Sequence, residues 1–515
     1  MLATSGRLSA KITALLLGAL CANSFAAEAP RSPSDVYGPR VGAAAPTLAA
    51  RLTATRRSDS TADTFRYWNQ IAIDASGLDH TPVEPGPVEE PPSRVFGEQL
   101  GPTRSSRAIA IVHIAMFDAV NAITGGYRSY TGLQRETRPA SIDAAIATAA
   151  HDTLVQMFPS QRPSFDSLYN EDIARIPPSQ ERQKNLGIAI GNRAATRILN
   201  RRVNDGSQFV EPRLGSEWVT SNAAGRWRQD PVSQAPIALG AYWGRVRPFV
   251  MASASQFRTP RPPAMTSDAY TAAYNEVKRL GGDGVHTPTE RSTDQTNIGI
   301  YWAYDGTPSL CAPPRLYNQI TTEISKAETS PIRLARLFAL VNVAMADAGI
   351  GSWESKYFWD FWRPVTGIRE ADPGTGPSGT GDRNPATIGD PGFFPLGAPA
   401  SNLQGPDFTP PFPAYPSGHA TFGGALFETL RNFYGRDSIS FTFTSDELNG
   451  ETVDSNGQVR PLLPRSFRSL SQAEEENGQS RIYLGIHWSF DKIEGIRQGR
   501  RIADYVYANA FQRVN

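Results

Sequence analysis

This 515-residue sequence has few cysteines, almost no net charge and few long apolar runs. Cys21 and Cys311 are its two cysteines, and the first lies in an N-terminal segment that we expect to be removed. The mature chain would then have no intrachain disulfide and would depend on core burial for stability. Lysine and arginine number 51 against 50 acidic residues, which argues against a nucleic-acid-binding surface over the whole protein.

The N-terminus has the pattern of a secretory signal. Arg7 and Lys11 precede the apolar run 12–20, and small residues follow it. This run is shorter than the ~20 helical residues that cross a bilayer, and we recognise no later run that is long enough. We therefore expect residues 1–26 to be cleaved and the protein to be secreted or periplasmic, with no membrane span.

The rest of the chain reads as helical. Residues 27–61 are rich in Ala, Pro, Arg, Ser and Thr and are expected to form a disordered leader. Apolar residues at three- and four-residue spacing then predict helices over 64–75, 105–123, 142–158, 180–200, 268–280, 293–304, 314–326, 332–361, 419–434, 472–486 and 490–511. A weak strand pattern occurs at 438–444.

These elements predict an all-α fold of two packed helix bundles, with an N-terminal helical domain at 62–265 and a C-terminal helical domain at 266–515. The 44 glycines and 41 prolines are more than average. They mark three long Pro/Gly-rich loops, at 206–263, 371–416 and 446–465, which we expect to form the active-site mouth.

The first candidate site segment contains Lys356 and Arg363 among aromatic residues, followed by Pro364. A spacing of seven predicts that the two cations lie two turns apart on one helix face, with the proline ending the helix. Two aligned cations on an aromatic face need an anionic partner. Taken alone, the segment is also explained by two surface cations with apolar stems.

The second segment is a Pro-rich loop that leads into a helix. Phe412 opens it, and Ser417, Gly418 and His419 close it. Main-chain N–H groups at such a helix start, approached closely at a glycine, form an anion cradle to which the serine adds a hydroxyl. A simple helix cap is the alternative explanation.

The third segment joins Arg481, a donor of paired hydrogen bonds to oxyanions, to His487 and Asp491. At a spacing of four, the carboxylate can orient the imidazole, although a solvated ion pair would show the same spacing. Together the three segments supply the donors for a tetrahedral oxyanion whose central atom is bonded to one imidazole.

The three segments resemble the signature of the vanadium-dependent haloperoxidases and type 2 phosphatidic acid phosphatases. Its parts are Lys356-x6-Arg363-Pro364, Pro416-Ser417-Gly418-His419 and Ser480-Arg481-x5-His487-x3-Asp491. Residues 298–495, including Trp353, Phe412 and the Tyr301-Trp-Ala-Tyr-Asp305 run, are similar to fungal-type vanadium chloroperoxidases. Upstream of 298 the sequence shows a compatible helical pattern and nothing more specific.

The resemblance implies one vanadate per chain, with His487 as the nitrogen ligand to vanadium. Its oxygens would lie on Lys356, Arg363, Ser417, the amide of Gly418, and Arg481. Asp305 would hold Arg481, and Asp491 would orient His487. Hydrogen peroxide, halide ions and an organic acceptor would be the substrates.

The same resemblance implies that His419 is the general base for peroxide and that Lys356 polarises it. Trp353 and Phe412 would line the halide side, where an aromatic residue at position 412 is the chloroperoxidase-type choice. The product would be hypohalous acid, formed from chloride or bromide, which halogenates the acceptor.

Two other functions remain open. A secreted acid phosphatase would use the same cradle for phosphate, with His487 as the nucleophile and His419 as the acid; chain length and the outer aromatics favour the peroxidase. A non-catalytic oxyanion-binding protein would have no need of His419. The other histidines, His80, His113, His151 and His286, belong to none of the three segments, and the oligomeric state is undetermined.

Overall fold

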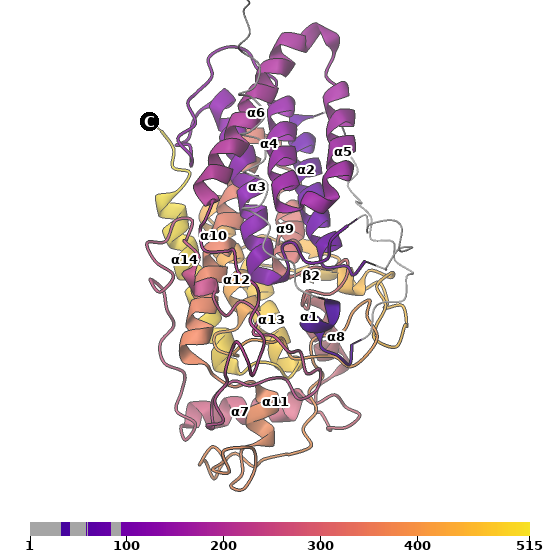
Figure 1. Ribbon diagram of the computed structural model, residues 1–515, viewed down its shortest axis with the longest axis vertical. Helices are drawn as coiled ribbons and strands as arrows, with labels where there is room; N and C mark the ends of the chain where they lie inside the picture. Colours follow the sequence, from indigo (N-terminus) through magenta and orange to yellow (C-terminus); the bar gives the residue numbers. More distant parts are fainter. Residues whose placement is uncertain (1–31, 42–57, 59, 84–93, 515) are drawn as a thin grey trace, which may run out of the picture.

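A computed structural model describes residues 32–41, 58, 60–83 and 94–514 (Figure 1). The expected signal segment, residues 1–26, lies outside them. The elements are α1 (Pro33–Tyr37), α2 (Thr61–Asp79), α3 (Gly101–Thr124), α4 (Ile142–Met157), α5 (Arg162–Ala174), α6 (Glu181–Arg202), α7 (Asp268–Leu280), α8 (Thr293–Tyr301), α9 (Pro313–Ile324), α10 (Pro331–Trp359), α11 (Pro364–Arg369), α12 (Gly418–Tyr434), α13 (Leu470–Tyr483), α14 (Ser489–Asn509), β1 (Phe441–Phe443) and β2 (Arg465–Phe467).

The fold is all-α, as predicted, and the two short strands form one antiparallel pair. Figure 1 shows α2 to α6 gathered at one end of the molecule, and α7 and α11 at the other. Helix α10 connects the first group to the C-terminal helices, because it contacts α3 as well as α12 and α14. One hydrophobic core runs through α2 to α6, α10, α12 and α14, and α7 and α11 pack into a second core around Trp362 and Trp488.

Two helices, α3 and α10, are long and apolar enough to cross a membrane by length and composition. This differs from the expectation that no such run follows residue 26. Their most apolar stretches are 89% and 100% buried inside the molecule. A helix at the centre of a bundle is apolar on all sides because neighbouring helices cover every face.

Glycines let α12 and α14 approach closely, and this contact fixes the second and third site segments relative to each other. A Cβ on Gly499 would lie 2.1 Å from the carbonyl oxygen of Thr421, and one on Gly424 would lie 2.6 Å from that of Ile496. Neither position therefore has room for a side chain. The start of α12 and the start of α14 are held side by side as a result.

Part of the expected leader is ordered. Residues 33–37 form α1, and Tyr37 is buried against Phe96 and Phe408, with ring centroids 6.2 and 6.4 Å away. The expectation of disorder is therefore wrong for this stretch. The signal in the sequence was Tyr37 itself, an aromatic residue within a polar, Pro-rich segment, because a large aromatic side chain in such a segment indicates packing against the core.

Helix α5 was not predicted, and its low content of apolar residues explains why: Phe165 is the one large apolar side chain that it buries fully. The predicted weak strand at 438–444 is confirmed as β1. Of the three predicted loops, 371–416 matters most for the site, because it runs from the end of α11 to the start of α12.

Candidate active site

Lys356 lies in the last turn of α10 and is fully buried. Its ammonium donates to the main-chain carbonyls of Pro413 (2.9 Å), Ala414 (3.0 Å) and Pro416, and so holds the loop before α12 against α10. Burial, reinforced by the charge of Arg363, holds the pKa of this lysine well below its usual range. A bound anion would favour the charged ammonium.

Arg363 does not share a helix face with Lys356, so that prediction is wrong. Helix α10 ends at Trp359, because Asp360 adopts a left-handed conformation (φ 53°) and its N–H caps the carbonyl of Lys356. Pro364 then begins α11 instead of ending α10. Proline is well accommodated at a first helical position, where its missing N–H would have no partner in any case.

The turn nevertheless brings the Arg363 guanidinium to the site. Its Nε donates to the carbonyl of Phe412 (2.9 Å), and its Nη1 donates to the carbonyl of Ile486 and to Nε2 of His487, both at 2.9 Å. Burial lowers the pKa of this arginine to about 9. Arg363 thus ties the loop 371–416 to the third site segment.

Arg481 lies near the end of α13 and is held by Asp305, as predicted. Its Nη2 donates to both carboxylate oxygens, at 2.6 and 2.9 Å. Its Nε and Nη1 are buried and have no hydrogen-bond partner in the part of the chain that the structure describes. Unpaired guanidinium N–H groups in a buried site are costly unless a ligand accepts from them.

The predicted pair of His487 and Asp491 is present. Nδ1 of the histidine lies 2.8 Å from Oδ2 of the carboxylate, which also accepts from the main-chain N–H of Trp488 at 3.1 Å. Burial, and then the charge of Arg363, lowers the pKa of His487 well below its usual range. The neutral ring therefore donates through Nδ1–H and keeps the Nε2 lone pair, the form that ligates metals.

The second segment begins α12, with Ser417 as the predicted N-cap. A Cβ on Gly418 would lie 3.2 Å from the ring of Trp353, so the glycine keeps this floor of the site open. Nε2 of His419 bonds to the carbonyl of Ala303. Since a carbonyl only accepts, Nε2 carries the proton, and burial together with Arg481 lowers the pKa of His419, leaving it neutral.

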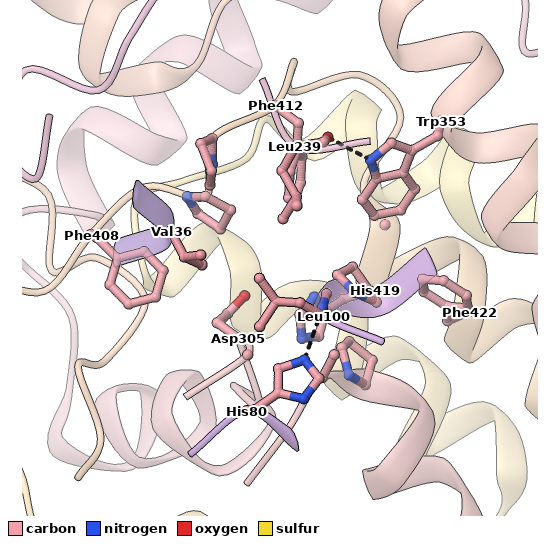
Figure 2. A pocket seen from close by; sticks show the side chains of 18 of the residues that line it. Val36, His80, Leu100, Leu239, Asp305, Trp353, Phe408, Phe412, His419 and Phe422 are labelled. Atoms are coloured by element: carbon pink, nitrogen blue, oxygen red, sulfur yellow. Dashed lines mark hydrogen bonds between the residues drawn. The ribbon is translucent and has the colours of Figure 1, made fainter. Parts of the chain in front are cut away.

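Two aromatic rings stand beside the cations. Trp353 and Phe412 lie with ring centroids 4.8 Å apart, and the indole N–H is turned away to the carbonyl of Leu239 (3.1 Å), as Figure 2 shows. The ammonium of Lys356 lies 5.5 and 5.1 Å from these two ring centroids. The lysine is thus covered by apolar surface.

One pocket unites these groups (Figure 2). Seven of the eleven predicted site residues line it, namely Asp305, Trp353, Phe412, Gly418, His419, Arg481 and His487. The other four predicted residues do not line the pocket but contact the lining residues or the loop before α12, namely Lys356, Arg363, Ser417 and Asp491. Residues separated by up to 186 positions in the sequence therefore form a single site.

The sequence did not reveal the outer wall of this pocket. His80, at the end of α2, lines it, although it lies outside all three segments. Val36, Leu100, Leu239 and Phe408 line it too. The sequence around His80 carries no sign of this, because the contact depends on how α2 and the start of α3 pack against the C-terminal helices.

The pocket suits an oxyanion. Three buried cations, Lys356, Arg363 and Arg481, surround it, and Nε and Nη1 of Arg481 have no acceptor among the described residues. A buried oxyanion needs such compensating charge and donors. The donor set therefore fits a vanadate or phosphate ion.

The comparisons with known proteins agree with this chemistry. Residues 336–515, which include all three segments, match the family model of the VCPO second helical-bundle domain. The vanadium chloroperoxidase of Curvularia inaequalis is 31% identical to the chain over 507 residues, covering 82% of this chain and 78% of that protein.

Two bacterial structures show the same fold. The first bacterial vanadium-dependent iodoperoxidase has a TM-score of 0.67 at 23% identity, covering 87% of this chain and 97% of its own. A holo-type bacterial vanadium-dependent chloroperoxidase has a TM-score of 0.59 at 19% identity, covering 79% and 92%. The identity to the Curvularia protein over most of both sequences establishes that this chain belongs to the vanadium-dependent haloperoxidase family.

Proposed function

We propose that this protein is a vanadate-dependent haloperoxidase that oxidises chloride and bromide with hydrogen peroxide. The product is hypohalous acid, which halogenates organic acceptors. One observation carries the proposal: Arg481 and His487 line the same pocket. Two buried guanidinium nitrogens of Arg481 have no acceptor among the described residues, and the Nε2 lone pair of His487 accepts from Arg363 alone. An oxyanion whose central atom accepts a nitrogen ligand matches both groups at once.

Vanadate, one per chain, would be held by its oxygens on Lys356, Arg363, Ser417, the amide of Gly418, and Arg481. His487 would exchange the contact of Nε2 with Arg363 for a bond to vanadium. Bound vanadate supplies a Lewis-acidic centre that makes peroxide reactive toward halide while the metal keeps its oxidation state.

His419 takes the proton of the incoming peroxide. Its Nε2 already donates to the carbonyl of Ala303, so Nδ1 is the nitrogen that accepts. The lowered pKa of the ring keeps this lone pair free at neutral pH. The three ammonium hydrogens of Lys356 bond to the carbonyls of Pro413, Ala414 and Pro416. Lys356 would exchange one of these bonds for a hydrogen bond to the peroxide oxygen that halide attacks, and would so draw electron density away from that oxygen.

Trp353 and Phe412 form the halide side. Both rings are almost fully buried, so water is displaced from the oxygen that halide attacks. Chloride is harder to oxidise than bromide and depends more on a dry, polarising site. The pair of aromatics therefore favours chloride oxidation, with bromide also accepted.

The deciding experiment is bromination of a phenol dye by the purified protein, with peroxide and bromide, with and without added vanadate. We expect turnover only when vanadate is present. Hydrolysis of 4-nitrophenyl phosphate without any bromination would instead identify a phosphatase that uses His487 as its nucleophile. Vanadate binding without either activity would identify an oxyanion-binding protein.

The protein is proposed to act outside the cytoplasm, secreted or periplasmic, because of the signal pattern in residues 1–26. N-terminal sequencing of the protein recovered after export tests this. A new N-terminus near Ala27 supports the proposal, and a cytoplasmic protein that keeps residues 1–26 contradicts it.

A further inference from the structure

The short segment 303–305, which follows α8, contacts two side chains of the site at once. The carbonyl of Ala303 accepts from Nε2 of His419. The carboxylate of Asp305 accepts from Arg481 at 2.6 and 2.9 Å. Asp305, His419 and Arg481 all line the pocket (Figure 2). A shift of this segment would therefore move the proton acceptor and one cation of the site together.

Tyr304, the middle residue of the segment, has an uncommon backbone conformation. Its φ of 43° is in the left-handed region, where residues other than glycine are disfavoured and persist only if the surrounding structure holds them. The residues on either side of it make the two contacts with the site. The geometry of the site therefore depends on what holds the main chain at Tyr304.

A buried glutamate holds this residue. Oε1 of Glu447 accepts from the main-chain N–H of Tyr304 at 3.2 Å, and the glutamate side chain is fully buried. Oε2 accepts from the hydroxyl of Ser401 and from Nη1 of Arg460. One carboxylate oxygen is thus fixed by two side chains, and the other holds the turn.

The glutamate is itself fixed against the end of α8. It lies in a single 3₁₀ turn, Asp446–Leu448, whose cap is Ser445. The hydroxyl of Ser445 accepts from the N–H of Glu447 (3.2 Å) and donates to the carbonyl of Tyr301 (2.7 Å). The N–H of Asp446 donates to the hydroxyl of Tyr304 at 2.7 Å. The 3₁₀ turn and the segment 303–305 are therefore joined through both main chain and side chains.

The ion pair of Glu447 and Arg460 is buried, and such a pair is often no more stabilising than apolar residues of the same volume. Apolar residues could not accept from the N–H of Tyr304, which would then be a buried donor without a partner. We propose that Glu447 is a positioning residue, which fixes the main chain at Tyr304 and so sets both the ring of His419 and the guanidinium of Arg481. The proposal rests on the proposed function, in which these two side chains accept a proton and hold the oxyanion.

The effect on His419 is specific. Because the carbonyl of Ala303 only accepts, it keeps the ring proton on Nε2 and leaves Nδ1 to take the proton of peroxide. A neutral imidazole without that partner can carry its proton on either nitrogen, and the Nδ1–H form could not accept at the site. Likewise, a displaced Asp305 would no longer hold Arg481 in place.

Two double variants isolate the hydrogen bond to Tyr304. Glu447→Gln with Arg460→Met removes the ion pair but keeps an amide oxygen for the N–H of Tyr304, and its amide N–H can donate to Ser401. Glu447→Met with Arg460→Met has a side chain of similar length and lacks that acceptor. Glu290→Gln is the surface control, because that carboxylate is 69% exposed and pairs with Arg279.

The proton position on His419 can be measured without turnover. Nitrogen-15 NMR of the vanadate-free, histidine-labelled protein distinguishes the two neutral forms, and His419→Gln assigns the signal among the six histidines. We expect the Nε2–H form in wild type and in the Glu447→Gln double variant, and a mixture of both forms in the Glu447→Met double variant. Only the Nε2–H form in the latter would overturn the proposal.

Vanadate dialysis and steady-state kinetics measure the consequences. We expect vanadate Kd to be at least about tenfold weaker in the Glu447→Met double variant than in the Glu447→Gln one, with kcat/KM for peroxide lowered by about tenfold or more. Equal values in the two would assign the effect to the lost ion pair and overturn the proposal. No bromination by wild type would overturn the proposed function instead, and the NMR comparison would still decide the role of Glu447.

Hydrogen exchange guards against a variant that fails to fold, because it uses the wild-type protein. Mass spectrometry of the peptide that contains Tyr304 should show its amide exchanging as slowly as main-chain amides within α12. Exchange at the rate of an unstructured peptide would show that Glu447 does not hold this turn, and would overturn the proposal whatever the variants do.

Discussion

Removing the carboxylate of Asp491 tests how His487 is oriented. In Asp491→Ala, Nδ1 of the histidine loses its acceptor at 2.8 Å and the N–H of Trp488 loses its acceptor at 3.1 Å. Loss of such a partner behind a metal-binding histidine costs about 10–100-fold in affinity, which corresponds to about 1.4–2.7 kcal/mol. The orphaned N–H costs a further ~1–3 kcal/mol in the free energy of unfolding.

Asp491→Asn should be milder. Both hydrogen bonds end on Oδ2, whereas Oδ1 is buried and has no partner among the residues that the structure describes. An amide oxygen in the Oδ2 position still accepts from both donors, so the histidine keeps its orientation. We therefore expect vanadate affinity to fall in the order wild type, Asn, Ala, with the Asn variant within about tenfold of wild type.

Equilibrium dialysis against vanadate, followed by metal analysis, measures these affinities, and chemical denaturation measures stability. Asp294→Ala is the matched control, because that carboxylate is 68% exposed and pairs with Arg465 at the surface. It should change neither quantity. Wild-type affinity in Asp491→Ala would refute the orienting role, and equal losses in Asn and Ala would assign the effect to charge and not to orientation.

Three further predictions concern proton transfer, halide choice and pH. His419→Ala should lower turnover by about 10²–10⁴-fold and weaken vanadate binding far less; equal losses in kinetics and dialysis would make His419 a ligand. Phe412→His should lose more chloride than bromide activity, because an imidazole brings water to the halide; an unchanged ratio of steady-state rates contradicts this. Burial raises the pKa of Asp79 to about 7, so the native state binds more protons than the unfolded chain between about pH 4 and 7, and stability falls as pH rises through that window. Asp79→Asn should remove up to about 1.4 kcal/mol per pH unit of this slope; parallel denaturation profiles for the two proteins would show that Asp79 does not cause it.

Local sequence signals were sufficient for most helices. The predicted range 268–280 matches α7 to the residue, because Ser267 caps its start, Asp268 follows in the first turn, and Gly281 follows its end. Such signals act within one or two turns and need no tertiary structure. The same holds for Ser417 at the start of α12 and for the four-residue step from His487 to Asp491.

Local signals failed where an ordinary residue adopts an uncommon conformation. Asp360 ends α10 in the left-handed region, where glycine is the usual residue. The seven-residue spacing from Lys356 to Arg363 predicted a shared helix face only if the helix continued past residue 360. Because α10 ends at Trp359, Arg363 instead precedes α11. The two cations still meet at the site, because the loop 371–416 folds back and offers carbonyls to both.

Contacts between distant segments could not be read from the sequence. His80 and Val36 reach the pocket only because α2 and α1 pack against the C-terminal half, and neither position carries a motif. Binding an oxyanion requires particular donor residues, which leave a short sequence motif. An apolar wall can be built from any apolar residues of suitable size and leaves no motif. The inner site was therefore predictable and the outer wall was not.

The vanadium content of His487→Ala tests the central claim most directly. The protein is loaded with vanadate, dialysed, and analysed for metal per chain, with His286→Ala as the control because that histidine lies exposed at the surface. We predict one vanadium per chain in wild type and in the control, and loss of stoichiometric binding in His487→Ala, since hydrogen bonds alone would then hold a solvated anion. Undiminished vanadium in His487→Ala would contradict the assignment of His487 as the vanadium ligand.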